Sequence, residues 1–432
     1  MVEISFPFFS VSETSKGLVV GSVCNSQLQT VDISFFVRTG SRFENKDNNG
    51  ISHFLEHMVF RGSKQYSAPY EITSAIEQFG GYIDASTYRD FTLYNVQTHH
   101  AHVAECLEVL AGMLVAPRFL SIETERMIIL EEMKESLNEK GNLIDIDALS
   151  YKNLFPSHPL GFPIDGSLRN IKKFTPNDFI NYHRDYYTNQ NSILLVSGNV
   201  HPRNIVSLAE EYFDEYHLGK KSVDKKPELL KKNSIHFVEA QDSQVQMRLA
   251  FPTYYQSEKD LLSFLFVSRL LDDGMSGILR RTLVDDLGLA YDLSCHPEIY
   301  SDVMLIIFEM TVSQEKCTKT LKGLLKILTA FCGNGAQITD FNRVKKRMIF
   351  HLDFMLDSVR ETNFWLGNHL LFEQNVHFEA KKNIIRLFEN DTVIQSAQKI
   401  FSSPCSLVAI GNIPRNESRH LRRLIAERNF IK

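Results

Sequence analysis

The chain has 432 residues, more than one ordinary domain, which favours two or three domains. Apolar residues make up 43% and charged residues 23%, a composition typical of a globular protein that excludes whole-chain disorder. The formal net charge is -5 and no basic stripe is present, so nucleic acid is not expected as a partner.

The N-terminal residues 1–17 lack the basic and apolar regions of a signal peptide. No run of 18 apolar residues occurs, so we expect no membrane span. The six cysteines are scattered without a C-x-x-C pair, which favours reduced thiols. We therefore expect a cytoplasmic protein, with an organelle matrix as the alternative.

Strands and helices are mixed along the first half of the chain. Alternating residues predict strands at 17–38 and a strand pair at 79–97. Helical spacing or composition predicts four helices, at 50–60, 69–79, 101–114 and 121–138. Because no regular β-α-β alternation appears, the predicted fold class is α+β, with helices packed on one face of a largely antiparallel sheet.

The predicted helix at 50–60 contains the sequence H-F-L-E-H at residues 53–57. His53 and His57 are four residues apart, so both imidazoles project from one helix face, a spacing that suits Zn²⁺. Glu56 lies on the same face, where it can take a proton from a metal-bound water and pass it to a leaving amine. This is the inverted zincin motif H-x-x-E-H. The alternative is an exposed helix face without a metal.

Two histidines leave zinc one protein ligand short, and a carboxylate from another helix is the usual third. The predicted helix at 121–138 offers several acids, among them Glu125, Glu131, Glu132 and Glu135. Another histidine group, His99, His100 and His102, lies where a strand turns into a helix, and we interpret it as a solvated turn.

A lysine-rich stretch with one Gly and one Pro, residues 216–234, predicts a solvated linker between two halves, 1–215 and 235–432. The halves resemble each other. SILLVSGNVHPRN at 192–204 is similar to SLVAIGNIPRN at 406–416, and the strands at 31–44 and 245–258 match at an offset of 214. A third pair, 79–97 and 287–310, indicates that the chain arose by duplication. The second half has no H-x-x-E-H.

Several motifs together resemble those of the pitrilysin-type, or inverzincin, zinc peptidases, in the branch of short two-domain subunits similar to the mitochondrial processing peptidase. The motifs are GISHFLEHMVFRGSK (50–64), GGYIDASTYRDFTLY (80–94), ERMIILEEM (125–133), HPLGFPIDG (158–166) and GLAY (288–291). The resemblance covers almost the whole chain. It implies two duplicated domains, a catalytic one at 1–215 and a second at 235–432 without the metal motif, and one Zn²⁺ per chain.

The resemblance also implies roles for particular residues. In that family the third ligand is the second Glu of an E-x6-E pair, about 75 residues after the last His, and Glu132 follows His57 by 75. Glu132 is therefore the implied ligand, and Glu125 is the implied carboxylate that orients a ligand.

The residues Asp84, Ala85, Ser86 and Thr87 resemble the family's edge strand, which pairs with an extended substrate. The family usually has Asn where Asp84 stands, so a polar contact to the substrate is altered here. Phe54 lines the pocket beside the scissile bond in this interpretation, and an apolar core position is its alternative.

In active relatives the second domain supplies an Arg and a Tyr, seven residues apart, that grip the substrate. Tyr291 matches the Tyr, but Val284 stands where the Arg is expected. Arg280 and Arg281 lie one turn earlier. Either this chain tolerates the loss, or a partner subunit provides the Arg-Tyr pair.

The predicted function is a zinc metalloendopeptidase with Glu56 and Tyr291 as catalytic residues. It hydrolyses short or unfolded peptides inside a chamber that forms by dimerisation, as a homodimer or as a heterodimer with a sister subunit. One alternative is the catalytic subunit of a heteromeric peptidase that matures a particular peptide. The other is a non-catalytic core or assembly subunit of the same fold, which a zinc-free purified chain would favour.

Overall fold

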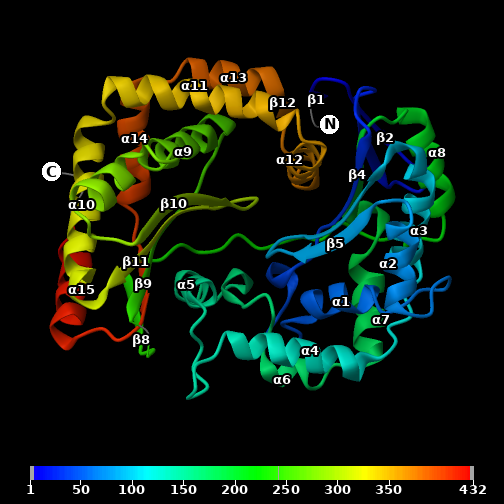
Figure 1. Cartoon of the computed structure of the whole chain (residues 1–432), viewed down its shortest axis with the longest axis horizontal. Helices are drawn as coiled ribbons and strands as arrows, with labels where there is room; N and C mark the ends of the chain where they lie inside the picture. The colour runs from blue at the N-terminus through cyan, green and yellow to red at the C-terminus, as the bar shows by residue number, and fades with distance from the viewer. Residues whose placement is uncertain (1–3, 242, 429–432) are drawn as a thin grey trace. The chain divides into compact units, whose positions relative to one another are not determined.

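The computed structural model describes residues 4–241 and 243–428 (Figure 1), which divide into two compact units. Unit 1 consists of Met1–Lys134, Phe162–Lys225 and Asp353–Glu379. Unit 2 consists of Glu135–Gly161, Lys226–Leu352 and Ala380–Lys432. This division differs from the predicted halves. The segment 135–161 of the first half belongs to unit 2, and the segment 353–379 of the second half belongs to unit 1.

The sheet of unit 1 has six strands in the order β2-β3-β7-β4-β6-β5. They are β2 (Phe9–Glu13), β3 (Val19–Cys24), β7 (Ser192–Gly198), β4 (Thr30–Val37), β6 (Thr92–His99) and β5 (Tyr82–Thr87). All neighbouring strands are antiparallel except β3 and β7, which are parallel. Two short strands, β1 (Ile4–Ser5) and β12 (Val376–His377), pair with each other in parallel. The strand β5 forms an edge of the larger sheet, as predicted.

One face of this sheet carries the core of unit 1. The residues Ile33 and Phe35 of β4 are fully buried in it, and Phe35 stacks on Phe213 with ring centroids 5.0 Å apart. The helices of unit 1 are α1 (Ile51–Val59), α2 (Pro69–Glu77), α3 (Val103–Val115), α4 (Ile122–Glu135), α6 (Leu168–Ile171), α7 (Pro176–Tyr186), α8 (Pro202–Tyr212) and α12 (Val359–Leu371). Four of the predicted helices, at 50–60, 69–79, 101–114 and 121–138, correspond to α1, α2, α3 and α4.

The sheet of unit 2 has the order β10-β11-β9-β13-β8. Its strands are β10 (Asp292–Ile299), β11 (Met304–Ser313), β9 (Gln244–Thr253), β13 (Ser406–Ile410) and β8 (Ser234–Val238). This order matches β5-β6-β4-β7-β3 of unit 1, and in both sheets the corresponding pair, β13-β8 or β7-β3, is parallel. The predicted fold class, two duplicated α+β domains with largely antiparallel sheets, is therefore confirmed.

The helices of unit 2 complete its core. They are α5 (Ile146–Leu154), α9 (Glu258–Leu271), a π-helical segment (Arg280–Asp286), α10 (Cys317–Asn334), α14 (Asn390–Phe401) and α15 (Arg415–Glu427). Two further helices, α11 (Ile338–Met355) and α13 (Phe378–Arg386), run through the points where the chain passes between the units.

Each sheet is covered on its second face by a helix from the opposite half of the sequence. In unit 1, α12 packs against β4 and β7, where Asn363 donates a hydrogen bond of 2.6 Å to the buried Asp32. Gly367 is required there because a side chain would collide with the ring of Phe36. In unit 2, α5 packs against β8, β9 and β13, with Tyr151 in the same cluster as Ala250. This exchange explains why the compact units differ from the predicted halves.

The lysine-rich stretch lacks regular secondary structure between α8 and β8, as a linker should. It is not solvated throughout, however. Asp224 forms ion pairs with Arg38 at 3.0 Å and with Arg42 at 2.9 Å, and only 12% of its side chain is exposed. The middle of the linker is therefore fixed to unit 1, because these two buried arginines need a carboxylate partner.

Asp90, in the turn between β5 and β6, is the buried acid beside this ion-pair cluster. Burial raises its pKa to about 7, although Arg42 opposes the shift. Because this pKa lies above the ordinary value, the carboxyl group stabilises the fold most at low pH and loses that contribution as the pH rises from about 4 to about 7.

We expect Asp90→Asn to be more stable than the unmodified chain above pH 7, by up to about 4 kcal/mol, with a smaller difference at pH 5. Urea unfolding at several pH values measures this, and the exposed Asp185→Asn should show no such trend. Parallel stability curves for Asp90→Asn and the unmodified chain would contradict the prediction.

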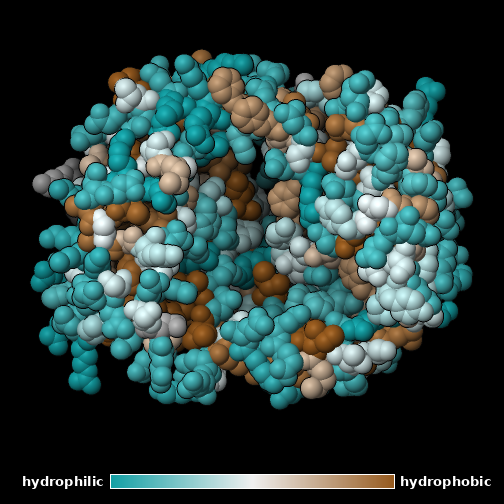
Figure 2. Space-filling model, viewed as in Figure 1, coloured by the Kyte–Doolittle hydropathy of each residue, from teal (hydrophilic) through white to brown (hydrophobic). Residues whose placement is uncertain are grey.

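The face of the molecule seen in Figure 2 is predominantly hydrophilic, with apolar side chains in small separate patches. Among the helices of residues 4–241 and 243–428, none combines the length and apolar character needed to cross a bilayer.

Candidate metal centre

The metal motif lies on α1, whose start is fixed by a buried carboxylate. The side chain of Glu44 accepts hydrogen bonds of 2.8 Å from the backbone N–H groups of Gly50 and Ser52. These are donors that the first turn of a helix leaves unpaired. Gly50 has a left-handed φ of 100° and lies against Gly166, so a side chain at this position would be strained and crowded. The first turn of α1 therefore has a defined position.

His53 and His57 project from one face of α1, as their spacing predicts. Their Nε2 atoms lie 3.3 Å apart. Burial lowers the pKa of His53 to about 4, and the neighbouring His57 adds to the shift. His53 is therefore neutral at pH 7, the state in which an imidazole nitrogen can bind a metal ion.

A carboxylate from α4 completes the group. The Oε2 atom of Glu132 lies 3.9 Å from Nε2 of His57, and one ligand atom from each of His53, His57 and Glu132 lies within 4.8 Å of the others. Two imidazole nitrogens and one carboxylate oxygen fit the preferences of Zn²⁺ at a site with an open position. The competing acid Glu131 is exposed and pairs with Lys134, so the structure favours Glu132.

Glu125 lies one repeat of the helix face before Glu132 and contacts His57 from behind. His57 Nδ1 and Glu125 Oε1 are 2.8 Å apart, and the other oxygen of Glu125 pairs with Arg61. Burial raises the pKa of Glu125, but the hydrogen bond from His57 and the charge of Arg61 together hold it below its ordinary value. When Nδ1 of His57 donates to this carboxylate, Nε2 of the neutral ring directs its lone pair toward His53 and Glu132.

The sequence interpretation did not single out Arg61. The sequence feature that could have identified Arg61 is its position four residues after His57. This spacing places it on the same face as His57, just beyond the end of α1. Because α4 supplies the carboxylate between them, the connection from Arg61 to His57 is visible only in three dimensions.

We expect Arg61→Met to weaken zinc affinity by about 10- to 100-fold, because Glu125 loses its cation and no longer holds His57 as firmly. Competition with a chromophoric chelator at pH 7 measures the affinity. Arg184→Met, which removes an exposed arginine paired with the neighbouring Asp185, serves as the control. Equal zinc affinities in the two variants would contradict this role for Arg61.

Glu56 lies beside the two histidines and receives a hydrogen bond of 2.7 Å from Oγ1 of Thr87, the last residue of β5. Burial raises the pKa of Glu56, while the bond from Thr87 and the nearby His57 oppose the shift. A half-buried carboxylate with a raised pKa is suited to accept a proton and to return it.

The predicted substrate strand has its side chains divided between two faces. Thr87 and Ala85 point toward α1 and the core, whereas Asp84 accepts a hydrogen bond of 2.6 Å from Arg360 of α12. Ser86 is exposed. The structure therefore brings Thr87 to the histidine group but directs the side chain of Asp84 to the opposite face, because neighbouring side chains of a strand alternate.

Phe54 is a buried side chain of α1. It has no exposed surface and packs edge-on against Phe179, with ring centroids 4.8 Å apart. Phe54 belongs to the core cluster of unit 1, the position that the core alternative describes.

The second-half candidates belong to unit 2. Tyr291 precedes β10 and has a side chain that is 80% exposed. Val284 packs against the core of unit 2, and Arg281 pairs with Asp340 at 3.2 Å.

The other histidine group, His99, His100 and His102, forms a partly exposed turn, as expected. His102 stacks on Phe79 with ring centroids 4.4 Å apart, and its Nδ1 atom lies 3.2 Å from a carboxylate oxygen of Glu105. Among the described residues, only His53, His57 and Glu132 form a group of three that could hold a metal ion.

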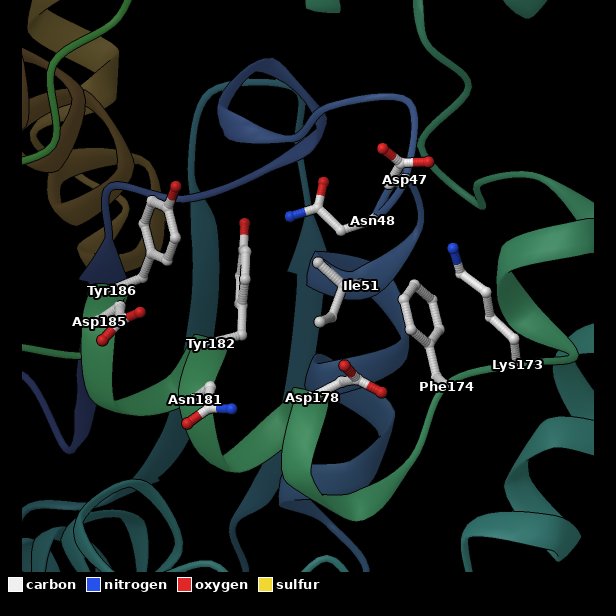
Figure 3. A pocket seen from close by; sticks show the side chains of 10 residues that line it. All are labelled: Asp47, Asn48, Ile51, Lys173, Phe174, Asp178, Asn181, Tyr182, Asp185 and Tyr186. Atoms are coloured by element: carbon white, nitrogen blue, oxygen red, sulfur yellow. The ribbon is translucent and has the colours of Figure 1, made fainter.

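A separate pocket of about 370 Å³ opens between the start of α1 and the helix α7 (Figure 3). Most of its lining is polar, with Asp178 and Asp185 of α7 facing Asp47 and Asn48 across it. None of the residues of the histidine and glutamate group lines this pocket, so it is distinct from the candidate metal centre.

An H-x-x-E-H helix, a carboxylate from a second helix and a duplicated α+β fold define the class of inverted zincins. Comparison with known families agrees. Residues 19–163 match the family described as Insulinase (Peptidase family M16), and residues 173–348 match the Peptidase M16 inactive domain. Together these matches cover more than half of the chain, and the chain belongs to peptidase family M16. The resemblance drawn from the sequence is confirmed.

Individual relatives support the same assignment. An "Uncharacterized zinc protease" of Rickettsia felis is 28% identical over 407 residues, covering 93% of this chain and 97% of that protein. The mitochondrial-processing peptidase subunit beta of Mus musculus is 32% identical over 218 residues, covering 50% of this chain and 43% of that protein. Among solved structures, a protease from Helicobacter pylori has a TM-score of 0.86 at 21% identity, covering 94% of this chain and all of that one. The first and last of these matches extend over both units.

Proposed function

We propose that this chain is a zinc-dependent metallopeptidase that binds one Zn²⁺ through His53, His57 and Glu132. The observation that carries the proposal is the convergence of these three ligand atoms within 4.8 Å, next to the carboxylate of Glu56. The relatives named zinc proteases, which match along nearly their whole length, support it.

Zinc, when bound, would supply a Lewis acid that polarises the scissile carbonyl and makes the attacking water more acidic. The side chains of the protein transfer the proton and orient the ligands. Glu56 accepts the proton of the water and delivers it to the leaving amine. Burial keeps His53 neutral, and Glu125 orients His57. Tyr291 is the residue proposed to stabilise the negative charge that develops on the oxygen of the scissile carbonyl.

The substrate is proposed to bind along β5. Within the described residues this strand pairs only with β6, so its outer edge offers backbone donors and acceptors to an extended peptide. Backbone pairing reads little sequence but requires an extended chain. Short or unfolded peptides are therefore the substrate class that fits, and Ala85 and Ser86 lie along the pairing edge.

A dimer is part of the proposal. A substrate chamber would form when two such chains associate, either as a homodimer or with a sister subunit. Val284 favours the second case, because it stands where an arginine is expected and packs into the core of unit 2. The heteromeric alternative, a catalytic subunit that matures a particular peptide, rests on this residue and on the relatives named subunit beta.

The test uses the purified full-length chain, zinc and a mixed set of quenched fluorescent peptides. We expect cleavage that stops with o-phenanthroline and returns when zinc is restored. A chain that holds one zinc but cleaves nothing would indicate a missing partner subunit. A chain that binds no zinc would favour the non-catalytic assembly subunit and would contradict the proposal.

A further inference from the structure

Thr87 connects the edge strand β5 to the carboxylate of Glu56 on α1. It is the last residue of the edge strand β5, and its Oγ1 atom donates a hydrogen bond of 2.7 Å to Oε2 of Glu56 on α1. We propose that Thr87 is a positioning residue that fixes the carboxylate of Glu56 relative to the strand that holds the substrate. This inference rests on the proposed peptidase function.

The register of the strand explains why Thr87 alone can do this. Thr87 pairs with Thr92 of β6, so its backbone belongs to the sheet, while its side chain points toward α1. The preceding Ser86 points to the other face and is exposed, and Asp84 is held by Arg360. Among the residues of β5, Thr87 is therefore the one whose side chain is placed to reach the general base.

The consequence for catalysis follows from geometry. The hydrogen bond from the Thr87 hydroxyl, together with an interaction from the Thr87 backbone, restricts the orientation of the Glu56 carboxylate. If the substrate backbone pairs with β5, the same strand positions both the scissile bond and the carboxylate of Glu56. A misplacement of about 1 Å between reacting groups can cost about 100-fold in rate, so one hydrogen bond at this point has a large effect without contacting the substrate itself.

The first experiment compares three variants of the full chain. Thr87→Val keeps the shape and β-branching but removes the hydroxyl, whereas Thr87→Ser keeps the hydroxyl. Thr98→Val makes the same change at a buried threonine of β6, whose hydroxyl accepts a hydrogen bond from Cys106 and not from the metal site. We expect Thr87→Val to lower kcat by about 10- to 100-fold, with KM and zinc content within twofold of the unmodified chain. Thr87→Ser should recover most of the activity, and Thr98→Val should retain it.

A zinc loss or a rise in KM alone in Thr87→Val, or a failure of Thr87→Ser to recover, would overturn the inference in favour of a structural or substrate-contact role. Crystal structures of the zinc-loaded chain and of Thr87→Val give a readout that does not depend on activity. The carboxylate of Glu56 should rotate or occupy several positions in the variant, and an unchanged carboxylate would also overturn the inference. If the unmodified chain binds no zinc, the proposed function fails. If it binds zinc but cleaves no peptide without a partner subunit, the two crystal structures still decide the role of Thr87.

Discussion

The variant Glu56→Gln is expected to lose about 10²- to 10⁴-fold in kcat while it keeps its zinc. Glutamine has nearly the same shape as glutamate and still has an oxygen that can accept the hydrogen bond from Thr87. It cannot accept the proton of the attacking water. Because His53, His57 and Glu132 are unchanged, metal content by atomic emission should stay at one zinc per chain.

The matched control for this variant is Glu77→Gln, which makes the same change at an exposed position at the end of α2. It should cleave peptides at the rate of the unmodified chain. A kcat for Glu56→Gln within about tenfold of that of the unmodified chain would exclude Glu56 as the general base. A loss of zinc would show that its role is structural.

Replacement of Glu132 by alanine should weaken zinc binding by more than about 100-fold, the upper end of the effect expected for residues that only support a ligand. Two imidazoles remain, and α1 alone cannot close a three-ligand site. Activity should fall with the metal content, and a large excess of zinc should restore part of it if the remaining ligands stay in place.

Glu131→Ala is the sharpest control because Glu131 is the neighbouring residue of the same helix and faces solvent, paired with Lys134. Dialysis against a zinc buffer followed by metal analysis separates the two variants. A chain that loses zinc with Glu131→Ala but keeps it with Glu132→Ala would reverse the assignment of the third ligand.

The parts of the site that depend on local spacing could be predicted from the sequence. His53, Glu56 and His57 share one turn and a half of a single helix, and a helix fixes their mutual arrangement wherever it lies. Spacing alone could not choose among the acids of α4, and the family resemblance was needed to single out Glu132. The orientations of Thr87 and Asp84 depend on how β5 is rotated relative to α1 and α12, which no local pattern determines.

The fold was predictable to a similar depth. Alternation and helical periodicity identified the strands and helices of unit 1, and the repeated G-N motifs revealed the duplication. The periodicity of α12 and α5 shows that each helix has a buried face, but not which sheet it covers. For the same reason the burial of Asp224 could not be foreseen in a stretch of lysines, since it depends on Arg38 and Arg42 more than 180 residues earlier in the chain.

The helix exchanged into unit 1 has a consequence for biosynthesis. All six strands of the sheet of unit 1 have been synthesised once β7 has left the ribosome. The face of that sheet that includes Phe36 and Asp32 is covered only after α12, which begins at Val359, has also been synthesised. Until then the nascent chain exposes Phe36, and Asp32 keeps its hydrogen bonds from Ser34 and Asn95 but lacks the one that Asn363 donates. Exposed apolar surface of this kind makes a chain prone to aggregation. A gene fragment that encodes only the first half would leave this state permanent. We therefore expect a fragment that ends before α12 to be less soluble than the whole chain, because it lacks the helix that packs against β4 and β7.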